Sequence, residues 1–109
     1  MAVLRSAYDQ WREKSSEVLK EVLPRGYFPE FPPLVQAAYT ISLKMWLHPN
    51  PGPFGSTFGN PQIIGMIRYD ILAGEWWGTT SGPKTGWVLY PDLASAAISM
   101  CAAHRLKGN

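Results

Sequence analysis

Apolar residues recur every three or four positions between residues 4 and 23, and charged residues occupy most of the intervening positions. The apolar set is Leu4, Ala7, Tyr8, Trp11, Val18, Leu19, Val22 and Leu23. This spacing is typical of an amphipathic helix that buries one side. Pro24 and Gly26 follow at once and end the helix. The pattern predicts a first helix over residues 4–23.

The next segment, residues 33–48, fits two patterns. Its polar positions Gln36, Thr40, Lys44 and His48 recur at intervals of four and leave the other faces apolar, as in a helix buried by its neighbours. The same stretch also alternates apolar and polar residues from Tyr39 to Met45, which is a strand pattern. We favour a second helix that begins at Pro33, because the segment is long and contains Ala37 and Ala38.

Residues 48–61 contain four prolines and three glycines in fourteen positions, so we expect a loop without regular structure. Loops of this length in small domains often carry function. Phe54 and Phe58 are its large apolar residues.

Three extended runs follow. Ile67, Tyr69 and Ile71 alternate with polar residues, and further runs at residues 75–80 and 85–90 flank a turn at residues 81–83. This spacing predicts a three-stranded antiparallel meander. The first run has a competing interpretation, because Asn60 and Gly74 are also typical of the two ends of a helix. That alternative stays open for residues 63–73.

The chain ends in an alanine-rich segment, residues 92–106, which Asp92 begins as a helix cap. The predicted fold is therefore a single α+β domain over residues 1–109. It has two N-terminal helices, a three-stranded antiparallel meander and a C-terminal helix. If the first of the three runs is a helix, the fold becomes mostly α with one hairpin.

The hairpin concentrates aromatic residues on two faces. Side chains alternate along a strand, so one face carries Trp77, Trp87 and Leu89, and the other carries Trp76, Val88 and Tyr90. We expect the Trp77 face to contribute to the core. On the Trp76 face, Gly78 and Gly86 leave a shallow floor that Arg68 and Lys84 could border. Either the terminal helix covers this second face, or the face is a recognition surface.

Composition and charge narrow the function classes. Ten basic and eight acidic residues are spread evenly along the 109 residues, for a net charge of +2, so no basic stripe indicates nucleic-acid binding. A single cysteine is compatible with a reducing compartment, and we expect a cytoplasmic protein. The longest mainly apolar run, residues 34–47, contains Lys44 and is too short to cross a membrane.

The motifs that approach known chemistry each lack a required part. Residues 78–85 read GTTSGPKT, a near match to a phosphate-binding loop, but Pro83 removes a backbone donor. Cys101 and His104 supply too few ligands for a metal site. Asp70 and Glu75 could form an acid and base pair, although solvent-facing positions explain them as well. We expect no catalytic residue, metal or cofactor.

The sequence therefore favours a small non-enzymatic module that binds another protein, as an inhibitor, adaptor or immunity-type binder acting by steric occlusion. The expected contact residues are Trp76, Tyr90, Arg68, Lys84, Phe54 and Phe58. A small-ligand domain or small enzyme, with an aromatic pocket and Asp70 or Glu75 as its polar group, is one alternative. A homodimeric structural subunit is the other.

Overall fold

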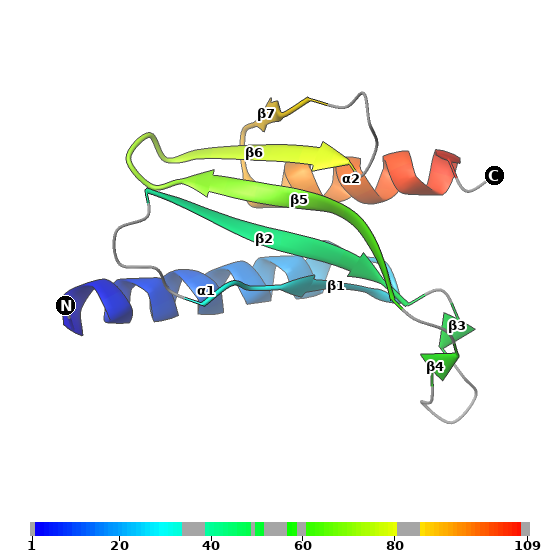
Figure 1. Ribbon diagram of the computed structural model, residues 1–109, viewed down its shortest axis with the longest axis horizontal. Coiled ribbons are helices and arrows are strands. Elements are labelled where there is room, and N and C mark those ends of the chain that lie inside the picture. The colour runs from blue at the N-terminus through cyan, green and yellow to red at the C-terminus, as the bar shows by residue number, and fades with distance from the viewer. Residues whose placement is uncertain are drawn as a thin grey trace.

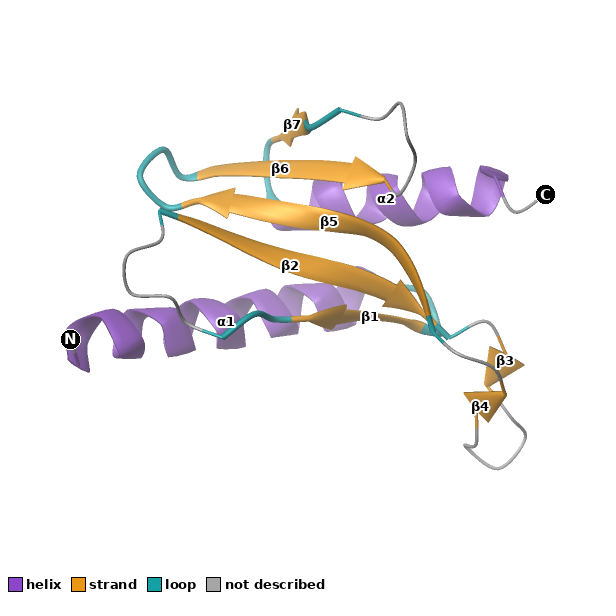
Figure 2. Ribbon diagram, in the orientation of Figure 1, coloured by secondary structure: helices purple, strands orange, loops and turns teal. Residues whose placement is uncertain are grey.

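The computed structural model describes residues 2–33, 39–48, 50–51, 57–58, 61–80 and 86–107. Within them the chain forms two helices and seven strands (Figures 1 and 2). In chain order these are α1 (Ala2–Val22), β1 (Tyr27–Glu30), β2 (Thr40–Leu47), β3 (Asn50–Pro51), β4 (Thr57–Phe58), β5 (Gln62–Asp70), β6 (Glu75–Thr80), β7 (Val88–Tyr90) and α2 (Leu93–Lys107).

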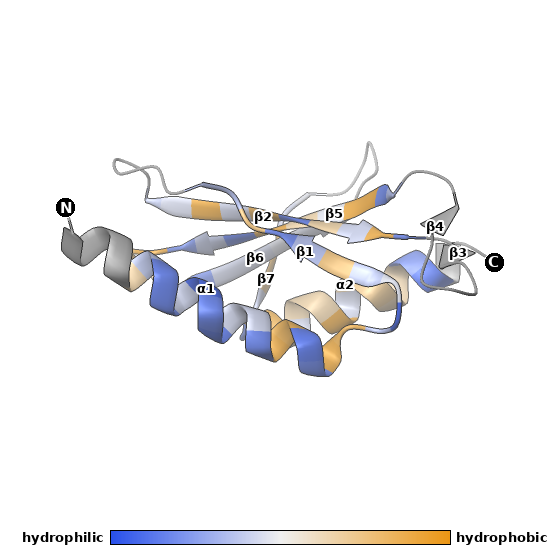
Figure 3. Ribbon diagram, turned by 90° about the horizontal axis from the view of Figure 1, so that it is seen from below, coloured by the Kyte–Doolittle hydropathy of each residue, from blue (hydrophilic) through white to orange (hydrophobic). Residues whose placement is uncertain are grey.

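The main sheet is antiparallel throughout, with the strand order β1-β2-β5-β6-β7. β3 and β4 form a separate two-stranded pair between β2 and β5 in the chain. Both α1 and α2 lie on the same face of the main sheet, which Figure 3 shows edge-on. The molecule therefore has two layers, and among the described residues no helix covers the other face of the sheet.

The prediction of two N-terminal helices and a three-stranded meander is wrong, because the segment assigned to the second helix contains strand β2. Leu43 and Met45 are fully buried, whereas Lys44 between them is exposed, as the strand pattern requires. The four-residue spacing of polar positions favoured a helix, yet four is also a multiple of two. Residues four apart share a face in both structures, so that spacing could not separate them.

The remaining strands correct two further expectations. β5 is a strand over most of the segment that could have been a helix, so the mostly α alternative is also wrong. β1 lies in the proline-rich connector, where Pro29 occupies an edge strand that tolerates a missing backbone donor. The strand predicted at residues 75–80 is present as β6, and the third run is shorter than expected, as β7.

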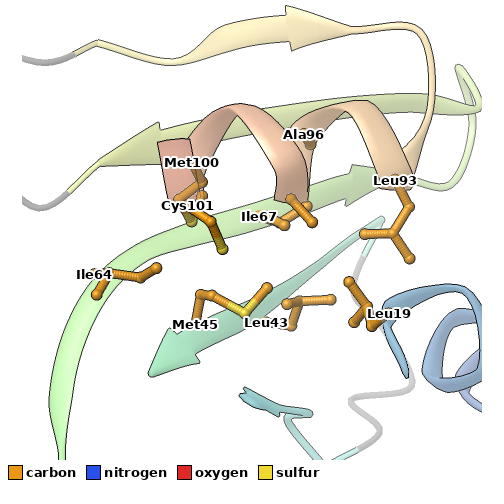
Figure 4. Packing of buried hydrophobic residues seen from close by; sticks show 10 residues of the cluster. Leu19, Leu43, Met45, Ile64, Ile67, Leu93, Ala96, Met100 and Cys101 are labelled. Carbon is orange, nitrogen blue, oxygen red and sulfur yellow. The ribbon is translucent and has the colours of Figure 1, made fainter. Parts of the chain in front are cut away.

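The core fills the space between the sheet and the two helices. Figure 4 shows Met100 and Cys101 of α2 directed toward Ile64 and Ile67 of β5. The other buried members of this cluster are Leu19, Leu43, Met45, Leu93, Ala96 and Ala97. Ile64 is the extra residue of a bulge, because Met45 pairs with Gly65 while the next residue of β2 pairs with Ile63.

Local hydrogen bonds fix the ends of the elements. The Asp92 carboxylate accepts from the Ser95 backbone N–H at 2.7 Å, as the sequence predicted for a helix cap. That hydrogen bond lowers the pKa of Asp92. At the end of α1, Gly26 has φ +95, and the Tyr27 N–H donates to the Pro24 carbonyl at 3.2 Å. A glycine suits this turn because other residues avoid positive φ.

Small residues let α2 lie close to the sheet. A Cβ at Gly65 of β5 would stand 2.3 Å from the Thr79 carbonyl oxygen and 2.8 Å from the Met100 sulfur. Ala96 and Ala97 of α2 are themselves fully buried. The distance between helix and sheet therefore depends on the missing side chain at Gly65.

We predict that Gly65→Ala lowers the free energy of unfolding by about 2 to 3 kcal/mol, because a backbone oxygen cannot move away from the new methyl group. Gly86→Ala is the matched control, since a Cβ at Gly86 would meet no atom of the described residues within 4 Å. It should change the free energy by no more than about 0.5 kcal/mol. Urea unfolding of both variants measures the difference, and equal stabilities would contradict the close approach described for α2.

Candidate functional site

The register of β6 and β7 decides which aromatic residues face the helices. Trp76 pairs with Tyr90, and Trp77 pairs with Leu89. Neighbouring residues of a strand point to opposite faces, so Trp76 and Tyr90 share one face, and Trp77 and Leu89 share the other. The predicted division of Trp76, Trp77, Leu89 and Tyr90 between the two faces is therefore confirmed.

Trp76 packs against the helix layer. Its ring stacks on Trp11 of α1, with the ring centres 5.9 Å apart and the planes 13° from parallel. On its own sheet face, the Tyr69 ring lies 4.5 Å away. Phe31 completes the group through an edge contact with Trp11. Trp76 is thus half-buried by an aromatic cluster beneath α1, whereas the sequence analysis had considered cover by the terminal helix.

Tyr90 also lies on the covered side, where it packs against the core. A Cβ at Gly78 would stand 3.0 Å from the Tyr90 ring, so the glycine makes room for that ring. A hollow of about 140 Å³ lies beside them, lined in part by Met100 of α2. The shallow floor expected beside Trp76 is therefore found beside Tyr90, and it faces the helix layer.

The expectation that Trp77, Trp87 and Leu89 contribute to the core is wrong. Trp87 is 38% exposed and Leu89 is 50% exposed, and neither belongs to the buried cluster. The physical reason is that Trp76 packs against Trp11 of α1. Because side chains alternate between the two faces of a strand, Trp77 then points away from the helices. We call the surface that carries Trp77 the open face of the sheet.

A row of side chains crosses the open face through four strands. Ser42 pairs with Arg68, Arg68 with Trp77, and Trp77 with Leu89. The Arg68 guanidinium lies over the ring of Trp87, 4.5 Å from its centre. We call Arg68, Trp77, Trp87 and Leu89 the tryptophan patch. Of the residues that sequence analysis proposed as contacts, Arg68 is the one that the described structure places on this face.

The charge of Arg68 is not neutralised by the part of the chain that the structure describes. Its guanidinium contacts the Trp87 ring, and its Nε is buried without a hydrogen-bond partner there. The nearby acid Asp70 is occupied otherwise, because its carboxylate accepts from the backbone N–H groups of Leu72 and Ala73 at 3.1 and 3.2 Å. An arginine held on an aromatic ring keeps its full charge and is preorganised to bind a carboxylate.

A second aromatic group lies at the β1 side of the open face. Trp46 pairs with Phe28 and donates its indole N–H to the Glu30 carboxylate at 2.8 Å. Phe28 stacks on His48 with the ring centres 4.8 Å apart. A hollow of about 440 Å³ lies next to them and also contacts Arg12 of α1. The remaining lining residues are Pro29, Phe31 and Pro61.

The side chains of three proposed contact residues lie outside the described part of the structure. Lys84 and Phe54 lie outside the described residues. For Phe58 the structure describes the backbone, as part of β4, and not the side chain. The phosphate-loop candidate also falls largely in this category, although its first residues, Gly78 to Thr80, form the end of strand β6.

The acid pair and the cysteine and histidine pair have structural roles. Asp70 and Glu75 are partners at the end of the β5 and β6 ladder, and the Asp70 carboxylate supports the turn between these strands. His104 exchanges a hydrogen bond with the Tyr27 hydroxyl through Nδ1 at 3.1 Å, which joins α2 to β1. Cys101 is buried in the core. Among the described residues, no three His, Cys, Asp or Glu side chains are grouped to bind a metal ion.

Comparisons with protein-family models, with curated proteins and with solved structures each found no match to this chain. None of the helices in the described part combines the length and apolar character needed to cross a membrane. Sequence reasoning missed Trp46 and Phe28 on the open face, because their segments were assigned to a helix and to a connector.

We predict that Trp76→Ala lowers the free energy of unfolding by about 3 kcal/mol, because it removes the contacts with Trp11 and Tyr69. Trp77→Ala should cost about 1 kcal/mol or less, since Trp77 lies on the face of the sheet that no described helix covers. Urea unfolding tests the order of the two effects. A larger loss for Trp77→Ala would mean that the two faces are assigned the wrong way round.

Burial raises the pKa of the Cys101 thiol to about 11. We therefore predict no reaction with a thiol reagent at pH 8 while the protein is folded, and complete reaction after unfolding. Because the ordinary thiol pKa of 9.0 lies below the folded value, the folded state holds the proton more tightly. Its contribution to stability is full below about pH 9 and falls as the pH rises toward 11. The Cys101→Ala variant should lack this alkaline loss.

Proposed function

We propose that this protein is a non-enzymatic module that binds another protein through the open face of its sheet. The observation that carries this proposal is the tryptophan patch, in which Arg68 stacks on Trp87 beside Trp77 on a face that no described helix covers. Tryptophan and arginine are the residues that most often dominate binding energy at protein interfaces. Aromatic side chains held on a sheet by their neighbours also lose little conformational freedom when they bind.

The chemistry of the face suggests the chemistry of the partner. Lys44 and Arg68 lie on neighbouring open-face rows of β2 and β5, whereas the Glu30 and Asp70 carboxylates already accept hydrogen bonds within the protein. We infer a partner surface that presents a carboxylate to Arg68 and apolar side chains to Trp77 and Leu89. By covering that surface, this protein would keep other molecules from reaching it, as a cytoplasmic inhibitor or adaptor acting by steric occlusion does.

The alternative of a small-ligand domain has one observation in its favour, the hollow of about 440 Å³ beside Phe28 and Trp46. Its size falls within the usual range for ligand sites. Glu30, the carboxylate among its lining residues, is occupied by the hydrogen bond from Trp46. Asp70 and Glu75, the polar groups expected for a pocket, do not line it. We therefore favour the protein partner.

The test begins with capture of partners from a lysate of the source cells on immobilised protein, followed by purification of the captured partner. We expect Trp77→Ala and Arg68→Ala each to weaken its affinity by about tenfold or more. Leu72→Ser is the control, because Leu72 is an equally apolar side chain, 77% exposed, in the turn between β5 and β6. Titration calorimetry on the purified pair measures the affinities.

The control should bind as the wild type does, and thermal unfolding should show that all three variants are folded. Equal affinity of the wild type and of both patch variants would contradict the proposal, and so would failure to capture any partner. Loss of binding through Leu72→Ser alone would place the contact surface at the turn and not on the open face.

A further inference from the structure

The two edges of the main sheet differ in how they are protected against pairing with another strand. β1 forms one edge and β7 forms the other. An unprotected edge strand exposes backbone N–H and C=O groups that can pair with a further strand. Natural proteins block such edges with proline, charge or a covering segment.

β1 carries this protection. Pro29 in the middle of the strand removes a backbone donor, and Glu30 adds an exposed charge. The chain then continues through Phe31, Pro32 and Pro33. The two prolines also lack a backbone N–H, so this edge offers few hydrogen-bond donors to another strand. A strand that approached β1 could not complete an antiparallel ladder along it.

Within β7 itself there is neither a proline nor a charge, although Pro91 and Asp92 follow the strand directly. The strand and the residue before it read Trp87, Val88, Leu89 and Tyr90. Val88 is 53% exposed, although it points toward the helix side, and Leu89 is 50% exposed on the open face. Within the described residues, β6 is the strand that pairs with β7, so its outer edge is unpaired there. Apolar exposure on both faces of one edge strand marks a pairing site.

We propose that β7 pairs with β7 of a second copy of this chain, antiparallel and centred on Leu89, so that the two sheets become continuous. In this register Leu89 lies opposite Leu89 of the second copy, and Val88 lies opposite Tyr90. A strand that pairs with its own copy brings any charge at its centre against the same charge. The absence of charge in β7 makes it compatible with itself, which is the reason for naming a second copy as the occupant.

The pairing would bring the two tryptophan patches next to each other, because Trp77 is the neighbour of Leu89 on β6. The strand is three residues long, so the interface is small and the dimer is weak. Sedimentation velocity from about 1 µM to about 1 mM protein should therefore show a monomer that becomes a dimer as concentration rises.

The charge at position 89 provides the decisive experiment. Leu89→Lys and Leu89→Glu each place like charges opposite each other in the proposed register, so each alone should dimerise about tenfold more weakly than the wild type, or worse. An equimolar mixture of the two variants places opposite charges together and should restore the dimer. Leu72→Lys, at an exposed site in the turn, is the control and should leave the dimer unchanged.

A wild type that stays monomeric throughout this concentration range overturns the proposal. A dimer that persists in Leu89→Lys alone also overturns it, because the contact would then lie elsewhere. If both charged variants are monomeric and their mixture does not associate, the register centred on Leu89 is wrong. The mixture also separates loss of pairing from loss of folding, since unfolded variants cannot recover a dimer when combined.

Discussion

The packing of Trp11 against Trp76 is the contact on which the arrangement of this molecule depends. It joins α1 to β6, two elements far apart in the chain, through nearly parallel rings. Because side chains alternate along a strand, placing Trp76 beneath α1 sends Trp77 to the opposite face. One contact in the helix layer therefore determines which aromatic groups the sheet presents on its open side.

The space beneath the helices also limits what the sheet can carry there. Gly65 and Gly78 lie where Met100 of α2 and the Tyr90 ring approach the strands, so two of the positions that face α2 carry no side chain. The tryptophan rings of β6 are accommodated beneath α1, in the cluster around Trp11, or on the open face, and the Tyr90 ring fits beside α2 because Gly78 has no side chain. The close contact of α2 with the sheet therefore limits the large side chains that the strands can carry beneath it.

The sequence predicted local features well and the identity of the layers poorly. The cap at Asp92, strand β6 and the division of the hairpin into two faces follow from neighbours within a few residues, and the structure has all three. Strand β2 could not be separated from a helix, because its polar positions repeat at a spacing common to both. Whether Trp76 or Trp77 is covered depends on Trp11, about 65 positions earlier in the chain, and local patterns carry no information about such a contact.

The exposed apolar groups gather where the helix layer gives least cover. β7 is one of the two edge strands, and Pro91 and Asp92 alone separate it from α2, so the first turn of α2 lies near one end of β7 and leaves Val88 and Leu89 half-exposed. On the opposite edge, Pro29 and Glu30 occupy β1 itself. Burying Val88 and Leu89 would gain roughly 25 cal/mol for each Å² of apolar surface removed from water, and β7 itself contains neither a proline nor a charge that would oppose that gain. The two edges therefore differ, and association is favoured at β7, which is the edge next to the tryptophan patch.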